Sequence, residues 1–282
     1  MILKAFYILS VTLICFILVL SSCSNNPTAP DNPFENFRYP YQNGISWFYN
    51  NRTFFYNVRP DSIGIYVSDD TVSGSGFSIY TGDTIINGVS SKLLRSEHVS
   101  PSHAHITLES FIQTDTGLIS NFGGKNGRSF GPYLPNSGIK FIFGNKEFYN
   151  VKDILSYYAY DINPDTGFVD TASVNCIKYP VIAGTEWHFR SLGGGLNLYK
   201  KYADIVDVST PLGVFNCMQV QRIFKNSSTP DTNFVLNDFL SEKGIIKRDY
   251  IIKNIEVYNS NNQVIGYFDV KEEYMIQLIN GF

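Results

Sequence analysis

A segment of eleven residues that occurs twice restricts the fold of this chain more than any other feature. Residues 39–49 read YPYQNGISWFY and residues 179–189 read YPVIAGTEWHF, so that Tyr, Pro, Gly and Trp coincide at identical offsets. Both Trp residues of the chain lie inside this match. A turn that contains Pro and Gly and leads into alternating apolar residues is typical of the start of a β-strand. The chain is therefore expected to contain two related β-units.

The alternation in the second copy predicts which side chains share a face of its strand. Side chains of a strand point to opposite faces in turn. Trp187 and Phe189 are therefore expected on one face, with Glu186, His188 and Arg190 on the other.

A second pair of segments, residues 111–119 and 239–246, is similar when one residue of slippage is allowed. Each is preceded by a unit that is typical of a β-hairpin. In the first half, residues 83–89 contain Asn-Gly, the strongest short hairpin pattern. In the second half, residues 210–217 contain Pro and Gly between apolar residues. We expect each half to form a strand that carries Trp, a hairpin, and an aromatic strand that leads to a Gly.

The composition favours the same fold class. The chain has 22 Phe, 19 Tyr, 22 Gly and 12 Pro, a balance that suits strands and turns better than a helical bundle. We predict a mainly β protein of antiparallel sheets, built as duplicated half-barrel or sandwich-like units with at most one or two short helices. One short helix is expected within residues 150–160. The first β repeat is predicted over residues 39–160, an acidic connector over 161–178 and the second β repeat over 179–282, as two subdomains or around one shared core.

The first residues are typical of an export signal. Lys4 precedes an apolar stretch from Ile8 to Leu20, which is short for a membrane span and suits the core of a secretory signal. The sequence Leu20-Ser21-Ser22-Cys23 resembles the lipobox of bacterial lipoproteins. This resemblance implies that residues 1–22 are a signal peptide and that Cys23 carries the lipid. The polar, Pro-rich residues 23–38 are then a lipidated tether.

Three later motifs resemble a group of uncharacterised outer-membrane lipoproteins of Bacteroidota-like bacteria. They are Gly184–Trp187, Pro211–Cys217 and Lys243–Ile246, and the resemblance covers mainly residues 179–282. It implies no established activity and no catalytic residues. A looser resemblance at the level of the fold is to half-open β-barrels of periplasmic lipoprotein carriers, which hold acyl chains in an apolar concavity. The residue after the lipobox is Ser24, which implies the outer membrane, and we favour the periplasmic face over the cell surface.

Two cysteines remain once Cys15 leaves with the signal and Cys23 is lipidated. Cys176 and Cys217 would then lie in an oxidising compartment, where a disulfide between them can persist. The alternative is two separately buried thiols, since a free cysteine packs like a small apolar residue.

An acidic stretch between the halves resembles a calcium loop. Asp161, Asn163 and Asp165 alternate before a Gly turn, and Asp170 follows. The Gly is one residue late and no Glu closes the loop, so a solvated acidic connector explains the stretch more simply. No other cofactor is expected.

The net charge and motifs limit the function. With 22 Lys and Arg against 25 Asp and Glu, the chain lacks the basic excess of a nucleic-acid binder. It has no phosphate-binding glycine loop and no Gly-x-Ser-x-Gly motif. We expect a lipid-anchored envelope protein that is a non-catalytic binding module, with an apolar ligand as the first candidate. The alternatives are a structural or assembly component that binds another envelope protein, and a hydrolase whose site residues lie far apart in sequence.

Overall fold

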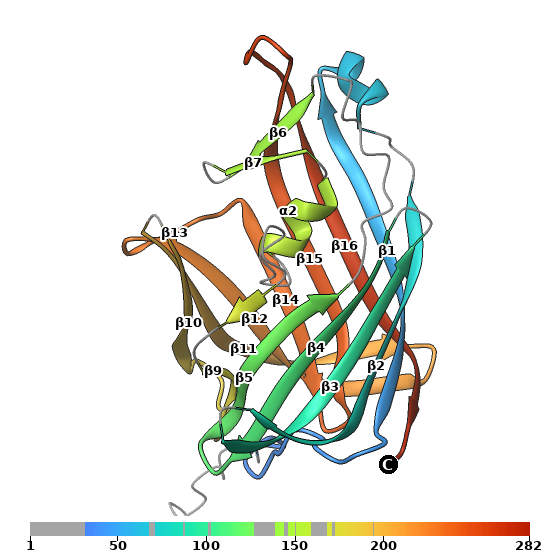
Figure 1. The fold of residues 1–282 in the computed structure, drawn as a ribbon, viewed down its shortest axis with the longest axis vertical. Helices are drawn as coiled ribbons and strands as arrows, with labels where there is room; N and C mark the ends of the chain where they lie inside the picture. Colours follow the sequence, from blue (N-terminus) through green and yellow to red (C-terminus); the bar gives the residue numbers. More distant parts are fainter. Residues whose placement is uncertain are drawn as a thin grey trace, which may run out of the picture. The chain divides into compact units, whose positions relative to one another are not determined.

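The protein is analysed as a computed structural model, which describes residues 32–67, 71–86, 88–100, 103–126, 139–143, 146–149, 151–158, 168–170, 173–193 and 195–282. Residues Phe34–Phe282 form one compact unit, and all strands belong to it (Figure 1). As expected from the sequence, this unit is mainly antiparallel β.

The elements follow one another in a simple order. They are β1 (Ser46–Arg59), the short 3-10 helix η1 (Asp61–Ile65), β2 (Val72–Ile86), β3 (Val89–Ser100), β4 (His103–Thr114), β5 (Gly117–Asn126), β6 (Lys140–Phe143), β7 (Lys146–Phe148), α2 (Val151–Tyr158), β8 (Phe168–Asp170), β9 (Val174–Lys178), β10 (Glu186–Gly193), β11 (Leu196–Thr210), β12 (Gly213–Asn226), β13 (Thr229–Pro230), β14 (Phe234–Ser241), β15 (Gly244–Tyr258) and β16 (Val264–Asn280). The helix α2 confirms the helix predicted within residues 150–160.

The strands form one sheet that curls into a nearly closed barrel. Its order is β10-β11-β12-β14-β15-β16-β1-β2-β3-β4-β5, and β8 and β9 pair with the free side of β5. The strands of the second half thus join those of the first half where β16 pairs with β1, from Ser46 opposite Asn280 to Arg59 opposite Tyr267. The range predicted as a connector contains β8 and β9, which continue the sheet.

The opposite junction, between β9 and β10, is closed in a different way. No strand pairing joins these two strands in the described part of the chain. Instead, side chains from β10 and β11 bond to the backbone of β9. Trp187 Nε1 donates to Asn175 O at 2.9 Å, Lys200 Nζ donates to Cys176 O at 3.1 Å, and the Tyr202 hydroxyl donates to Lys178 O at 2.7 Å. We call this junction the β9–β10 seam.

The two copies of the repeated segment form the same turn. Gly44 and Gly184 have positive φ values of 88° and 86°, which glycine adopts without steric cost. Their amides donate to Tyr80 O at 2.9 Å and to Tyr202 O at 2.7 Å, respectively, on the next strand. The Trp that follows each turn is buried and lies against the ring of that same tyrosine.

Hairpin turns lie where the sequence predicts them. Ile86 pairs with Val89 around the Asn-Gly dipeptide, so β2 and β3 form the expected hairpin. Thr210 pairs with Gly213 between β11 and β12, and its hydroxyl donates to Gly213 O at 3.0 Å. The same hydroxyl accepts a hydrogen bond from the Leu212 amide at 3.1 Å, and such side-chain bonds to the backbone two residues on stabilise turns.

Two core clusters fill the ends of the barrel. The first, the helix-side core, packs Ile154 and Leu155 of α2 and residues of β6 and β7 against the inner faces of β12, β14 and β15. The second, the turn-side core, packs Phe34, Phe37 and Tyr39 against Trp47 and its neighbours. In Figure 1 the N-terminal segment, drawn in blue, lies at the lower end of the view, and β6 and β7 lie toward the upper end. Packed elements therefore fill both ends of the barrel.

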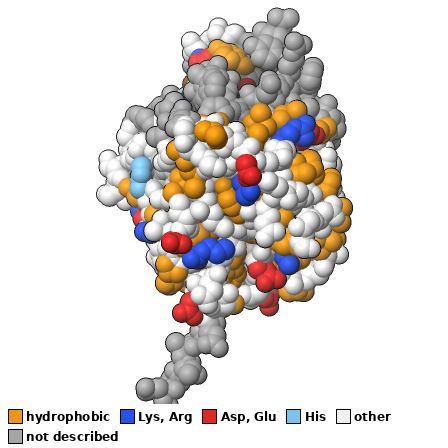
Figure 2. All heavy atoms as spheres, turned by 60° about the horizontal axis from the view of Figure 1, so that its bottom comes forward, with side chains coloured by type: hydrophobic (Ala, Val, Ile, Leu, Met, Phe, Trp, Pro, Cys, Tyr) orange, Lys and Arg blue, Asp and Glu red, His pale blue; other side chains and the backbone are white. Residues whose placement is uncertain are grey.

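One face of the outer surface mixes charged and apolar groups. Figure 2 shows basic and acidic side chains next to one another on the face that contains the N-terminal turns, with apolar groups between them. Within the described residues, no helix has the length and hydropathy that a bilayer crossing requires.

Candidate functional site

A cavity of about 160 Å³ lies inside the barrel. Its lining comes from strands of both halves and from the N-terminal segment. Seven of the side chains that line it are aromatic: Tyr39, Trp47, Tyr49, Tyr80, Phe111, Phe189 and Tyr274. Most of the apolar lining belongs to the turn-side core, so the cavity adjoins that end of the barrel.

Charged side chains cross the barrel interior on five neighbouring strands. Each one occupies the centre of an inward-facing row, with a buried apolar or aromatic residue two positions before and two positions after it. We call these five residues the interior charged belt: Lys200 on β11, Arg222 on β12, Asp238 on β14, Arg248 on β15 and Glu272 on β16.

Strand register brings the members of the belt together. Lys200 lies directly opposite Arg222, and Asp238 lies directly opposite Arg248. Glu272 lies opposite Thr53, whose hydroxyl donates to Glu272 Oε1 at 3.3 Å. Side chains directly opposite on one face of an antiparallel pair are neighbours, and the bond between Arg222 and Asp238 joins the first two pairs into one polar layer. Glu272 lies opposite Tyr250, which bonds to Asp238.

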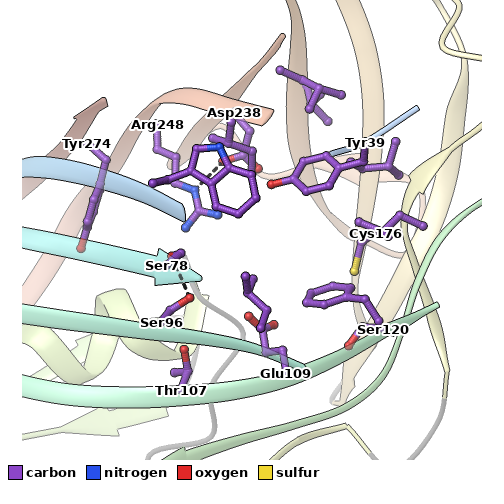
Figure 3. Close-up of a pocket in the computed structure, with 18 of the residues that line it drawn as sticks. Tyr39, Ser78, Ser96, Thr107, Glu109, Ser120, Cys176, Asp238, Arg248 and Tyr274 are labelled. Atoms are coloured by element: carbon purple, nitrogen blue, oxygen red, sulfur yellow. Dashed lines mark hydrogen bonds and ion pairs between the residues drawn. The ribbon is translucent and has the colours of Figure 1, made fainter. Parts of the chain in front are cut away.

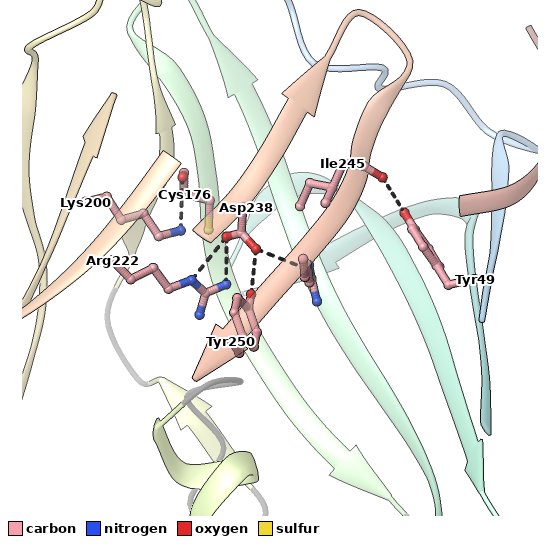
Figure 4. Close-up of polar contacts among 8 residues, drawn as sticks. Tyr49, Cys176, Lys200, Arg222, Asp238, Ile245 and Tyr250 are labelled. Atoms are coloured by element: carbon pink, nitrogen blue, oxygen red, sulfur yellow. Dashed lines mark hydrogen bonds and ion pairs between the residues drawn. The ribbon is translucent and has the colours of Figure 1, made fainter. Parts of the chain in front are cut away.

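Asp238 holds the centre of this layer (Figure 4). Its Oδ2 accepts hydrogen bonds from Arg222 Nε at 3.1 Å and Nη2 at 3.0 Å, and its Oδ1 lies 3.3 Å from Arg248 Nε. The Tyr250 hydroxyl donates to Asp238 Oδ1 at 2.5 Å. Burial alone would raise the pKa of Asp238, but Arg222, Arg248 and Lys200 outweigh it and lower that pKa to about 2. Asp238 is therefore a carboxylate at neutral pH.

Tyrosines around the belt stay protonated. Burial raises the pKa values of Tyr39, Tyr49 and Tyr250 well above 10. Their hydroxyls can therefore donate hydrogen bonds, as Tyr49 does to Ile245 O at 2.9 Å.

Two cations of the cavity wall lie around one aromatic ring. Lys200 Nζ is 3.9 Å from the centroid of the Phe189 ring, and Arg190 Cζ is 4.5 Å from the same centroid. Both residues are buried, with exposed fractions of 6% and 8%. The prediction that Arg190 faces away from Phe189 is wrong, because the register shifts between His188 and Arg190. The irregularity turns Arg190 into the cavity wall, as β-bulges do.

The opposite wall carries hydroxyl groups. Ser78, Ser96 and Thr107 come from β2, β3 and β4, and Figure 3 shows them across the cavity from Asp238 and Arg248. The hydroxyls of Ser78 and Ser96 are hydrogen-bonded to each other at 2.8 Å. One carboxyl group, Glu109 on β4, shares this wall.

The hydroxyl of Tyr80 also belongs to the cavity. Tyr80 is 1% exposed, and its ring makes edge contacts with Tyr41, Trp47 and Phe111. Within the part of the chain that the structure describes, its hydroxyl has no hydrogen-bond partner. A buried hydroxyl without a partner is costly and calls for an explanation in a native structure.

Cys176 and Cys217, for which the sequence left a disulfide and two separate thiols open, are both free thiols in the structure. Cys176 lies on β9 and lines the cavity, whereas Cys217 lies on β12 within the turn-side core, with Sγ 3.5 Å from Phe215 O. Burial raises the pKa of Cys176. Burial, with the nearby carboxylate of Asp207, raises the pKa of Cys217 to about 12.

All but one of the remaining predicted site residues lie outside the described part of the chain. This holds for Cys23 and for three of the calcium-loop residues, Asp161, Asn163 and Asp165. The fourth, Asp170, ends β8. The described residues hold no cluster of three His, Cys, Asp or Glu side chains that would suit a metal ion.

The charged belt is the part of the site that the sequence analysis missed. Its pattern is nonetheless visible in the sequence, as a charge with apolar residues at positions −2 and +2. Leu198-x-Lys200-x-Tyr202 and Val220-x-Arg222-x-Phe224 are two examples. A charge in the middle of an inward-facing row is unusual, because burying it requires partners.

No family model matches this chain, and no curated protein matches it. Two solved structures are similar. One is a Bacteroides fragilis protein described as exported and as having a YmcC-like fold, with 9% identity, a TM-score of 0.35, and coverage of 87% of this chain and 99% of that chain. The other is described as a lipoprotein of Parabacteroides distasonis, with 9% identity, a TM-score of 0.31, and coverage of 86% of this chain and 98% of that chain.

Proposed function

We propose that this chain is a lipid-anchored envelope protein whose barrel binds a small ligand in its interior cavity. One observation carries the proposal: packed side chains fill both ends of the barrel, yet a cavity with aromatic, hydroxyl and charged groups remains between them. Convergent polar groups in a largely apolar pocket are typical of small-molecule sites.

The composition of the lining supports a binding role over a purely structural one. A barrel that serves only as a spacer is more stable when its interior is packed with apolar side chains, because buried charges must be desolvated. The interior charged belt and the hydroxyl groups of Ser78, Ser96 and Thr107 instead keep polar groups inside. The aromatic side chains beside them suit an apolar group of the ligand, and this supports the apolar ligand proposed from the sequence.

The lipid anchor is supported by the sequence alone. The apolar stretch, the lipobox resemblance at Cys23 and the Pro-rich tether together suit a protein held at the outer membrane, with the periplasmic face favoured. The proposed role is non-catalytic because the charged residues of the cavity stabilise one another. Asp238, for example, is bonded to both Arg222 and Arg248.

Native mass spectrometry tests the binding role directly. The protein purified from its own cells is expected to retain a small molecule that denaturation releases. Ser120 lines the cavity and is 5% exposed, so Ser120→Leu should occupy part of the space and reduce the retained fraction. Ser209→Leu, at an exposed position of β11, is the matched control and should leave that fraction unchanged.

A bare protein mass for the wild type would contradict the proposal. If an envelope protein co-purifies in place of a small molecule, the assembly alternative is supported instead.

A further inference from the structure

The hydroxyl of Tyr80 is a buried polar group of the cavity wall that the protein itself does not satisfy. Tyr80 is 1% exposed and lines the cavity. In the part of the chain that the structure describes, its hydroxyl has no hydrogen-bond partner. An unpaired polar group in a protein interior is costly, and native structures rarely keep one. A bound molecule that pairs with this hydroxyl would remove that cost.

Strand register separates Tyr80 from the hydroxyl groups on the same wall. Ser78 lies opposite Ser96, and Ser96 lies opposite Thr107, so these three residues form one row across β2, β3 and β4. Tyr80 belongs to the next row, in which the residue opposite it is Leu94. Leucine has no polar atom in its side chain, so Tyr80 lacks a cross-strand partner of the kind that joins Ser78 to Ser96.

Aromatic rings hold Tyr80 in place and surround it with apolar surface. Its ring makes edge contacts with the rings of Tyr41, Trp47 and Phe111, at centroid distances of 5.5, 6.0 and 6.4 Å. Trp47 and Phe111 also line the cavity. A ring packed on several sides cannot turn its hydroxyl toward a distant partner without losing these contacts. The hydroxyl is therefore preorganised for a partner inside the cavity.

The hydroxyl of Tyr80 acts as a hydrogen-bond donor. Burial raises the pKa of Tyr80 well above its ordinary value, so the group keeps its proton. The complementary atom of a ligand is then an acceptor. Among aromatic rings, an uncharged carbonyl or alcohol oxygen costs less to desolvate than a carboxylate does. The chemistry that fits this hydroxyl is therefore an uncharged acceptor oxygen.

The size of the cavity limits the rest of the ligand. Its volume of about 160 Å³ is comparable to that of an engineered apolar cavity of about 150 Å³ that takes up benzene. The aromatic lining beside Tyr80 suits apolar atoms of the ligand. The space therefore suits a molecule of about one six-membered ring.

We infer that the cavity selects an uncharged molecule with a compact apolar body and one acceptor oxygen, which bonds to the Tyr80 hydroxyl. This inference rests on the proposed function and specifies its ligand class. The acceptor oxygen has two chemical sources, a carbonyl group and an alcohol group, and the probes below separate them.

The test compares oxygen compounds with oxygen-free analogues of nearly the same shape. The pairs are cyclohexanone with methylenecyclohexane, and cyclohexanol with methylcyclohexane. Their dissociation constants are measured by isothermal titration calorimetry on protein freed of retained molecules by dialysis. Water solvates the oxygen compounds better than their analogues, so the ratio within each pair is compared between the wild type and Tyr80→Phe.

The substitution Tyr80→Phe removes one oxygen atom and keeps the ring. In at least one pair, the wild type is expected to favour the oxygen compound about ten-fold more than the variant does, because only the wild type can form the bond. An effect in the ketone pair alone identifies a carbonyl ligand, and an effect in the alcohol pair alone identifies an alcohol. Tyr267→Phe makes the same change at a residue that is 36% exposed and does not line the cavity, and it should keep the wild-type ratios.

Melting curves separate a binding role of this hydroxyl from a structural one. Without ligand, Tyr80→Phe should melt at the wild-type temperature or above it, because the substitution breaks no bond within the described protein. A lower melting temperature would show that the hydroxyl is bonded inside the protein, and would overturn the inference.

An infrared measurement keeps the test decisive if Tyr80→Phe does not fold. A hydrogen bond to a carbonyl oxygen weakens the C=O bond. The stretching band of cyclohexanone on the wild type should therefore lie at lower frequency than in an apolar solvent. A hydroxyl that donates to an alcohol oxygen can also donate to this ketone, so a band at the apolar-solvent position would overturn the inference for both sources.

The outcomes separate this inference from the proposed function. Equal ratios in the wild type and in Tyr80→Phe overturn the acceptor oxygen but leave a ligand-binding cavity, in which water serves Tyr80. Absence of binding by all four probes, with a small molecule still retained from cells, overturns the compact ligand class alone. If no probe binds and nothing is retained, both proposals fail.

Discussion

The main-chain nitrogen of Tyr39 donates a 2.9 Å hydrogen bond to the hydroxyl oxygen of Tyr179, 140 residues further along the chain. These two tyrosines are the first residues of the two copies of the repeated segment. The hydroxyl of Tyr179 in turn donates to Gln113 Oε1 at 2.9 Å. The starts of both copies therefore meet at the turn-side core.

Removal of the Tyr179 hydroxyl should weaken the contact between the starts of the two repeated segments. Tyr179→Phe leaves the buried amide of Tyr39 without its acceptor, which costs about 1–3 kcal/mol in the free energy of unfolding. Urea denaturation measures the change. Tyr267→Phe is the control, because Tyr267 is 36% exposed, and it should change stability by no more than about 0.5 kcal/mol. Equal stability of both variants would show that the Tyr39–Tyr179 bond is not formed.

Both Trp residues should be strong anchors of their halves. Trp47 is 1% exposed and donates to Lys243 O at 2.6 Å, and Trp187 is 7% exposed. Each Trp→Ala substitution should cost about 3–5 kcal/mol, as for other large buried aromatics. Thermal melts measure this, and an unchanged melting temperature for either variant would contradict the packing described.

Asp238 should make stability depend on acid pH. Its pKa in the folded protein is about 2, below its ordinary value of 3.8, so its contribution is fully present above about pH 4 and is lost as the pH falls toward 2. Asp238→Asn leaves Arg222 and Arg248 without their carboxylate and should cost about 3–5 kcal/mol at pH 7. It should also flatten the stability profile between about pH 4 and 2. Asp115→Asn, in an exposed turn, is the control and should keep the slope of the wild type.

The two thiols should react only after unfolding. Burial keeps Cys217 protonated, with a pKa of about 12, and raises the pKa of Cys176, whereas the thiolate is the reactive form. Iodoacetamide should therefore label the native protein slowly. Alkylation of the denatured protein without reductant should add two groups, measured by intact mass, with Cys23 blocked by lipid. No added groups would instead support the disulfide expected from the sequence.

If the chain is lipid-anchored as proposed, the sulfur of Cys23 is the atom that receives the lipid. Cys23→Ala should abolish metabolic labelling with palmitate and leave an unprocessed precursor, because the lipobox cysteine supplies the only acceptor sulfur. Labelling that persists in this variant would contradict lipidation at Cys23.

The hairpins and turns are predictable from the sequence because their determinants are local. Gly88 at the β2–β3 turn and Gly44 and Gly184 in the repeated segments act through their own backbone conformations, which have positive φ values. The short helix α2 follows in the same way from the spacing of apolar residues. Each of these patterns lies within about ten residues, so no knowledge of strand order is needed.

The cavity is not predictable in this way, because it depends on register between distant strands. Lys200 and Asp238 approach each other only once β11, β12 and β14 are paired in the observed order. The prediction of which face of β10 carries Arg190 was wrong for another reason. One irregularity in β10 reverses the alternation of side chains on which that prediction depends. A charged residue with apolar residues two positions before and after it can be recognised in the sequence as facing inward. The sequence does not show which of these charged residues come into contact with one another.

The β9–β10 seam has a consequence for solubility. Unpaired strand edges are templates for aggregation, because their free backbone groups can pair with another chain. Trp187, Lys200 and Tyr202 occupy acceptors on the backbone of β9, so they protect that edge as well as close the wall. If these three residues were replaced by small ones, the edge of β9 would have free backbone acceptors and could pair with another chain, even where the rest of the barrel stays folded.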